Sequence, residues 1–137
     1  MKDKEKITYS NEKSFTVEQA ERLFKSVNWL SANYPERLFK ALGGCDTLYT
    51  AWDGDRLVGL INAIDDGELT AYVHYLVVNP EYQKSGIGKT LLQMVKEKYK
   101  DYLYLLLVAE NPSLVDYYES CGFERETDTS VMVILNK

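Results

Sequence analysis

The spacing of apolar residues predicts two helices in the N-terminal third of the chain, after a short first strand over residues 7–9. Thr16 and Gln19 stand three residues apart, as in a capping box, and open the first helix. Pro35 suits the first turn of the second helix, which Gly43-Gly44 should end. The apolar positions at helical spacing are Val17, Ala20, Leu23, Phe24 and Val27 in the first helix, and Leu38, Phe39 and Leu42 in the second.

Apolar runs separated by Asp-Gly pairs predict a three-stranded antiparallel meander in the middle of the chain. The pair Asp53-Gly54 lies between runs over residues 48–52 and 57–64. Asp-Gly tolerates the positive φ that tight hairpin turns require. A second pair, Asp66-Gly67, leads into a long strand over residues 69–78.

The second half of the pattern predicts one βαβ unit. A helix follows the long strand, and a nearly unbroken apolar run over residues 103–109 suits a strand buried on both faces. The crossover should be right-handed, with a ligand crevice beyond the carboxyl ends of the strands. A short helix over residues 113–120, closed by Gly122, and one or two strands within residues 123–136 complete an α/β fold with a mixed sheet. The apolar positions of the crossover helix are Leu91, Leu92, Val95 and Tyr99.

The length of 137 residues suits a single domain, over residues 1–137, with one hydrophobic core. Residues 1–6 carry three lysines and no apolar stretch, so they predict neither a signal peptide nor a membrane anchor. Residues 1–5 are expected to be flexible. No later run is long enough to span a bilayer, and we expect a cytoplasmic protein without a membrane partner.

The cysteines, the single histidine and the net charge argue against several classes of site. Cys45 and Cys121 are far apart in the sequence, which favours two free thiols, and His74 is the only histidine. We therefore expect no metal site and no Cys/His catalytic pair. The net charge of -5 argues against a nucleic-acid partner, which would need a basic face. It is compatible with a cationic substrate such as an amine.

The glycine-rich segment over residues 83–88 indicates a phosphate-binding loop between the long strand and the crossover helix. The first amides of a helix have no intrahelical partner and lie at the positive end of its dipole, so they bind anions. Gly86 and Gly88 let the backbone approach a pyrophosphate closely, and Lys84 and Lys89 add positive charge.

Two common phosphate motifs do not fit this segment. A Walker A loop would need glycine at position 83, which is Gln83. A dinucleotide fingerprint starting at Gly86 would need a small residue at position 91, which is Leu91. The pattern that remains is Q-x-x-G-x-G after a strand that ends in Val78-Asn79-Pro80.

That pattern resembles the acetyl-CoA signature of the GNAT superfamily of N-acyltransferases. A second motif supports the resemblance: Glu110-Asn111-Pro112, followed by the run Tyr117 to Phe123, has the order and separation of the family's later motif. The resemblance covers about residues 47–126 well. It implies a GNAT-like fold with a mostly antiparallel central sheet, one parallel pair and about four flanking helices. Residues 26–29 and 57–60 also look similar to a subgroup that includes plant serotonin acetyltransferase-like proteins.

The resemblance implies the binding of acetyl-CoA. Strand amides would hydrogen-bond the pantetheine arm, and loop amides would hold the pyrophosphate. Asn111 matches a position that contacts the arm, although a turn residue before Pro112 is an equal alternative. Tyr117 matches a wall of the cofactor site or a packing residue. The implied strand and loop residues are Leu76, Val77, Val78, Gln83, Lys84, Ser85, Gly86, Ile87, Gly88, Lys89 and Thr90.

The resemblance also implies catalytic roles. The Leu76 amide would face the thioester oxygen, and Tyr118 matches the usual general acid, with a buried aromatic as its alternative. Some members carry a glutamate as general base where this chain has Tyr72. His74 shares a predicted strand face with Tyr72 and Leu76 and offers another proton acceptor, although a lone strand histidine is often structural.

Fewer residues of the sequence indicate where the acceptor amine would bind. Trp29 and Tyr72 are candidate pocket residues, while Trp52 is better explained by packing. Asp65 and Asp66 could bind a cationic amine or form a turn with the glycine that follows.

Together these residues predict acetyl transfer from acetyl-CoA to a primary amine of a small molecule or peptide, by direct attack in a ternary complex. The alternative is a catalytically idle acyl-CoA-binding sensor or partner subunit, which the departure at Tyr72 keeps open. The sequence leaves the acceptor open, and also the choice between a monomer and a homodimer.

Overall fold

The computed structural model describes residues 6–136, so the expected flexibility of residues 1–5 lies outside the described residues. The chain divides into two compact units, the first ending at Leu106 and the second beginning at Leu107. Among the described helices, none is long and apolar enough to cross a membrane.

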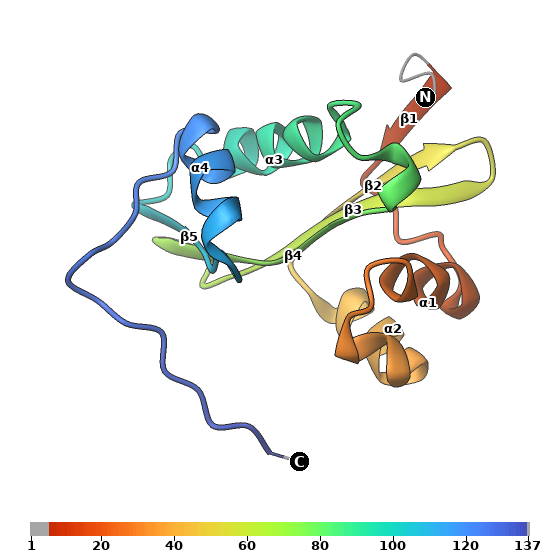
Figure 1. The fold of residues 1–137 in the computed structure, drawn as a ribbon, viewed down its shortest axis with the longest axis horizontal. Helices are drawn as coiled ribbons and strands as arrows, with labels where there is room; N and C mark the ends of the chain where they lie inside the picture. The colour runs from red at the N-terminus through yellow and green to blue at the C-terminus, as the bar shows by residue number, and fades with distance from the viewer. Residues whose placement is uncertain (1–5, 137) are drawn as a thin grey trace. The chain divides into compact units, whose positions relative to one another are not determined.

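Five strands form one sheet in the order β1-β2-β3-β4-β5 (Figure 1). The first four strands pair antiparallel, and β5 runs parallel to β4. Gly54 and Gly67 take positive φ values of 60° and 84° in the two turns of the predicted meander. The predicted α/β class with a mixed sheet is therefore confirmed. The strands are β1 (Ile7–Ser10), β2 (Thr47–Asp53), β3 (Arg56–Asp65), β4 (Thr70–Val78) and β5 (Tyr104–Leu107).

The helices begin and end close to the predicted positions. Thr16 Oγ1 accepts the Gln19 amide at 3.1 Å, and Gln19 Oε1 accepts the Thr16 amide at 2.8 Å, which completes the capping box of α1. Lys13 Nζ donates to the carbonyl of Gly43 at 2.9 Å, at the C-terminal end of α2. The helices are α1 (Val17–Lys25), α2 (Pro35–Gly44), α3 (Ile87–Lys98) and α4 (Pro112–Ser120), with 3-10 turns η2 (Leu30–Asn33) and η3 (Pro80–Tyr82).

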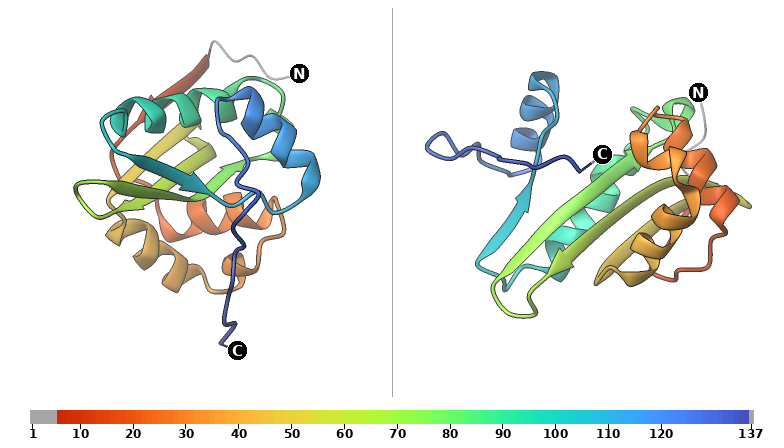
Figure 2. Two further views of the ribbon diagram at one scale, coloured as in Figure 1. Left: turned by 90° about the vertical axis from the view of Figure 1, so that its left-hand side faces the viewer. Right: turned by 90° about the horizontal axis from the view of Figure 1, so that it is seen from below.

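In the first unit, α1 and α2 cover one face of the sheet and α3 covers the other (Figure 2). Phe24 and Leu42 lie in the core between the sheet and the first two helices, together with Leu60 and Val77 of the sheet. On the α3 side Gly59 is buried against the helix. Since glycine has no Cβ, α3 can approach β3 closely at this point.

The predicted C-terminal strands are wrong, because residues 124–136 form no strand. The run Val131–Leu135 has high β propensity, yet its side chains are 58–90% exposed. β propensity measures how well a side chain fits a half-buried pleated surface, and the run has no such surface. The expected burial of the fifth strand on both faces is also wrong, since Tyr104 and Leu106 are exposed. An apolar run does not reveal how many faces are covered.

The Gly59→Ala variant tests the close approach of α3 to the sheet. An added Cβ would lie 3.0 Å from Ile87 Cγ2, 3.3 Å from Ala51 Cβ and 3.3 Å from Leu91 Cδ1. We expect the variant to lower the free energy of unfolding by about 1–3 kcal/mol, because the contacts force α3 away from the sheet. Urea denaturation measures the change.

Gly43→Ala is the matched control. Gly43 lies inside α2 with nothing within 4 Å of a built Cβ. Alanine should therefore raise the free energy of unfolding by about 0.5–1 kcal/mol. Equal effects of the two substitutions would show that the space at Gly59 is not limiting.

Candidate active site

A β-bulge in the middle of β4 determines which side chains share a face. Asn62 pairs with Tyr75 and the next residue of β3, Ala63, pairs with Val73, so His74 is left as the extra residue. The buried side chain of Asn62 holds the bulge, because its Oδ1 accepts the Tyr75 amide at 2.9 Å.

The bulge moves side chains between the two faces of the sheet. Gly59 of β3 faces α3, and Ala63, four residues further along β3, lies on the same face. Val73 pairs with Ala63 and therefore also lies on the α3 side. Val77 pairs with Leu60 and lies in the core with α1 and α2. These two residues of β4 are four apart, and in a regular strand they would share a face.

The prediction that His74 shares a face with both Tyr72 and Leu76 is therefore wrong for Leu76. Leu76 pairs with Ile61 and lies on the α3 side. Tyr72, His74 and Tyr75 lie on the α1 side, where their rings stack. The His74 ring is 4.0 Å from the Tyr75 ring at an interplanar angle of 19°, and 5.8 Å from the Tyr72 ring.

The row of rings continues onto α1 and the segment that follows it. Tyr75 lies 5.6 Å from Trp29 and 5.0 Å from Phe24, measured between ring centroids. We call the four rings of Trp29, Tyr72, His74 and Tyr75 the aromatic row. The structure therefore brings three predicted site residues, Trp29, Tyr72 and His74, onto one face.

The His74 side chain is exposed to solvent, but the rings of Tyr72 and Tyr75 that stack on it remove part of its water. This desolvation lowers the pKa of His74 from its ordinary value of 6.5, because it disfavours the charged imidazolium. The ring is neutral at pH 7 and can accept a proton.

Two hydrogen bonds fix the direction of the β4 amides beyond the bulge. The Tyr75 amide donates to Asn62 on β3, and the Asn79 amide donates to the Val58 carbonyl of β3 at 2.8 Å. Successive amides of a strand point to opposite edges. The amides of odd-numbered residues from 75 to 79 therefore face β3, and those of even-numbered residues face the opposite edge.

The amides of Leu76 and Val78 thus face the edge away from β3, as a pantetheine arm would need. The amide of Val77, predicted for the same role, points toward β3 instead. β5 begins where the Tyr104 amide donates to the Leu69 carbonyl at 2.9 Å. A parallel strand of four residues from that point runs alongside only the first half of β4.

The glycine loop follows β4 and forms the N-terminus of α3. Gly86 is the N-cap in the left-handed conformation with φ 90°, and Lys84 also has a positive φ of 66°. Among the described residues, no side chain caps this helix. The Ser85 hydroxyl donates instead to the Tyr82 carbonyl. The first intrahelical bond runs from Thr90 to Gly86, so the amides of residues 87–89 remain available for an anion.

The carboxylates of Asp65 and Asp66 are engaged at the other end of β4. Asp65 Oδ2 accepts the Tyr99 hydroxyl at 2.6 Å, and Asp65 Oδ1 accepts the Gly67 amide at 2.8 Å. Asp66 Oδ1 accepts the three amides of residues 68–70, which lowers the pKa of Asp66. These contacts support the turn-forming alternative for both residues.

Trp52 and the cysteines have the roles expected of structural residues. Trp52 packs against the core and donates its Nε1 hydrogen to Thr50 Oγ1 at 2.8 Å. Within residues 6–136, neither Cys45 nor Cys121 takes part in a disulfide. Among residues 6–136, no cluster of three His, Cys, Asp or Glu side chains could hold a metal ion.

The second unit carries the later motif. Asn111 is the N-cap of α4, and its Oδ1 accepts the Ser113 hydroxyl. The ring of Tyr118 lies 5.3 Å from that of Tyr117 and 6.0 Å from that of Phe123. Burial raises the pKa of Tyr117 to about 12 and also raises the pKa of Tyr118, so both hydroxyls are protonated at neutral pH.

Sequence reasoning missed Asn62 and Tyr75. The signal for them is weak: two rings, His74 and Tyr75, are adjacent in the sequence, where a regular strand would place them on opposite faces. Only the bulge, which depends on a buried amide side chain of another strand, puts both rings on one face.

Comparison with known proteins agrees with this geometry. Residues 14–123 match the model of the acetyltransferase (GNAT) family. A GNAT acetyltransferase from Streptococcus pneumoniae TIGR4 is 32% identical, with a TM-score of 0.83, over 96% of this chain and 98% of the other.

Two curated relatives are also similar. The ycf52-like N-acetyltransferase of Prochlorococcus marinus is 26% identical over 129 residues, which are 90% of this chain and 71% of the relative. The chloroplastic GCN5-related N-acetyltransferase 2 of Arabidopsis thaliana is 31% identical over 75 residues, which are 53% of this chain and 29% of the relative. The chain belongs to the acetyltransferase (GNAT) family, which confirms the predicted family and the predicted class of enzyme.

Proposed function

We propose that this protein transfers an acetyl group from acetyl-CoA to a primary amine of a small molecule or peptide. The observation that carries the proposal is the succession of two sets of backbone donors. The outward amides of Leu76 and Val78 lead directly into the uncapped N-terminus of α3. A pantetheine arm joined to a pyrophosphate needs donors in that order.

In this proposal the pyrophosphate lies on the loop over residues 83–90, with Lys84 and Lys89 beside it. The left-handed conformation of Lys84 supports the assignment, because a non-glycine residue in that conformation is strained by roughly 1 kcal/mol and such strain gathers at functional sites. Asn111 and Tyr117 of the second unit are proposed to contact the cofactor arm.

The acceptor amine is proposed to approach along the aromatic row. Trp29, Tyr72 and Tyr75 form an apolar wall, and His74 is exposed at its rim. Asp65 and Asp66 take no part in binding the amine, since the turn engages both carboxylates.

The chemistry is a direct attack. The amine nitrogen adds to the thioester carbon, the carbonyl becomes an oxyanion, and the Leu76 amide stabilises that charge. His74 takes the amine proton, directly or through water. The C–S bond then breaks, and Tyr118 gives its proton to the leaving sulfur. Amide, CoA thiol, tyrosinate and imidazolium result. Loss of a proton from the imidazolium to solvent and uptake of a proton from solvent by the tyrosinate restore the two side chains.

A screen of amines, polyamines, aminoglycosides and peptide N-termini for release of free CoA tests the activity. Turnover of at least one acceptor supports the enzyme. Binding of acetyl-CoA without turnover of any acceptor would favour the idle sensor, and no binding of any CoA ester would refute both.

The titration of His74 can be measured directly, because it is the only histidine of the chain. We expect its imidazole NMR signal to titrate below the ordinary pKa of 6.5, since burial disfavours the charged form. The value of kcat/KM should fall as the pH drops through that same pKa, because the protonated ring cannot act as a base. His74→Gln should lower kcat by about 100-fold.

Tyr75 provides the controls for this titration. Tyr75→Phe keeps the ring that stacks on His74 and should leave the histidine pKa unchanged. Tyr75→Ala removes the ring and should move the pKa back toward 6.5. If kcat/KM does not change as the pH passes through the measured pKa of His74, His74 is not the base.

Tyr118→Phe should lower kcat by about tenfold, less than the roughly 100-fold that general acid catalysis ordinarily contributes, because a thiolate with a reference pKa near 8.5 leaves tolerably without a proton. Tyr117→Phe is the matched comparison: it keeps the ring and should change kcat less. Steady-state kinetics with a saturating acceptor measures both. Unchanged kcat in Tyr118→Phe would remove Tyr118 from the mechanism.

A further inference from the structure

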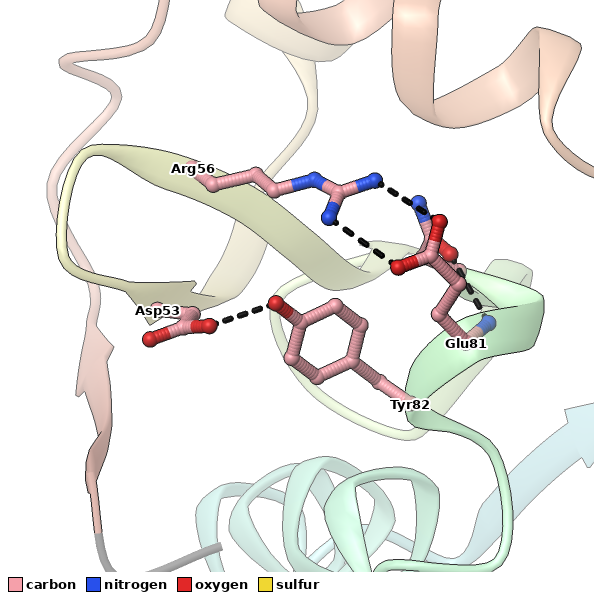
Figure 3. A network of polar contacts seen from close by, with 5 residues as sticks. Asp53, Arg56, Glu81 and Tyr82 are labelled. Carbon is pink, nitrogen blue, oxygen red and sulfur yellow. Dashed lines mark hydrogen bonds and ion pairs between the residues drawn. The ribbon is translucent and has the colours of Figure 1, made fainter. Parts of the chain in front are cut away.

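The segment that precedes the glycine loop is anchored to a distant hairpin. Tyr82, the last residue of η3, is only 2% exposed, and its hydroxyl donates to Asp53 Oδ2 at 2.5 Å. Asp53 is the last residue of β2, next to the turn that leads into β3. Figure 3 shows the Tyr82 ring reaching from the loop side toward this hairpin.

A second link joins the same two segments. Arg56, the first residue of β3, donates to both carboxylate oxygens of Glu81 at 3.3 and 3.4 Å. Its guanidinium carbon also lies 5.5 Å from the centroid of the Tyr82 ring (Figure 3). The Arg56 and Glu81 side chains are 38% and 56% exposed, so water screens this pair strongly. The bond between Tyr82 and Asp53 is therefore the stronger of the two links.

Tyr82 is also connected to the loop that it precedes. Its carbonyl accepts the Ser85 hydroxyl, and its amide donates to the Asn79 carbonyl at 2.8 Å. The residues that follow take the left-handed conformations of Lys84 and Gly86. Lys84 is not a glycine, so it keeps this conformation only where its surroundings hold it. Tyr82, two residues before Lys84, and Ile87, next to Gly86, are the buried residues on either side.

We propose that Tyr82 and Asp53 are positioning residues that hold the glycine loop in its pyrophosphate-binding conformation. The proposal rests on the proposed binding of acetyl-CoA. The hairpin between β2 and β3 lies outside the loop and outside the predicted cofactor residues, yet it would set the affinity for the phosphate-bearing part of the cofactor.

The test compares two donors that differ in the part the loop would hold. CoA esters carry the pyrophosphate and the nucleotide, whereas S-acetyl-pantetheine has neither. In Tyr82→Phe we expect the Kd for acetyl-CoA to rise about tenfold, equivalent to ~1.4 kcal/mol, with kcat nearly unchanged. Turnover of S-acetyl-pantetheine should change by less than about twofold, because the loop plays no part in holding it.

Asp53→Asn is the second variant, and it keeps the volume of the side chain and one acceptor oxygen. It should raise the Kd for acetyl-CoA by less than Tyr82→Phe, because a neutral acceptor makes a weaker bond. It also gives a readout if Tyr82→Phe does not fold, and thermal melting of each variant reports folding. Arg56→Gln removes the exposed ion pair with Glu81 and the cation beside the Tyr82 ring, but leaves Tyr82 and Asp53 in place, and should have the smallest effect of the three.

The outcomes separate the two proposals. An equal loss with both donors would mean that Tyr82 and Asp53 support the fold without positioning the loop, and would overturn the inference. Unchanged affinity for acetyl-CoA in both variants would overturn it too, while wild-type binding upholds the proposed function. Failure of the wild-type protein to bind any CoA ester would overturn both.

Discussion

The hydrogen bond from the Tyr75 amide to Asn62 Oδ1 is the interaction on which the candidate site depends. It stabilises the bulge, and the bulge changes which residues of β4 face each side of the sheet. Without the extra residue, His74 and Tyr75 would point to opposite faces and could not stack. The register change therefore creates the aromatic row.

Strand β4 would contact both proposed substrates, acetyl-CoA through its backbone amides and the acceptor amine through its side chains. Outward amides of Leu76 and Val78 are offered at the edge, while side chains of the aromatic row occupy the α1 face. On the opposite face, Gly59 lets Ile87 at the start of α3 lie against β3. The close approach fixes the first turn of the helix against β3, and β3 pairs with β4, whose outward amides lead into that turn. Strand and helix can then act on one elongated ligand.

The sequence was sufficient for features that depend on local chemistry. The capping box at Thr16, the Asp-Gly turns and the glycine loop each rest on a few adjacent residues, and the structure has all of them. The bulge at His74 could not be found in this way, because it depends on the buried Asn62 of a neighbouring strand. The ambiguity at Asp65 and Asp66 has the same origin, since their partners were unknown until the turn was seen.

Longer-range features failed for a related reason. Val131–Leu135 reads as a strand by composition, but a strand exists only where a partner supplies hydrogen bonds and a surface. The burial of the run around Tyr104 and Leu106 likewise depends on what covers the sheet. The sequence pattern showed that these segments are apolar, but it did not show which parts of the protein pack against them.

The division between backbone and side-chain recognition also bears on the similarity to other proteins. A structure with 32% identity retains a TM-score of 0.83. Backbone amides survive almost any substitution except proline, so donors such as those of Leu76 and Val78 can persist while sequences diverge. Recognition of the acceptor would change readily with sequence, because it would depend on the ring side chains and on Asn62, whose bond to the Tyr75 amide puts two of the rings on one face. Differences in acceptor among relatives should therefore be sought in the aromatic row and the residues that position it.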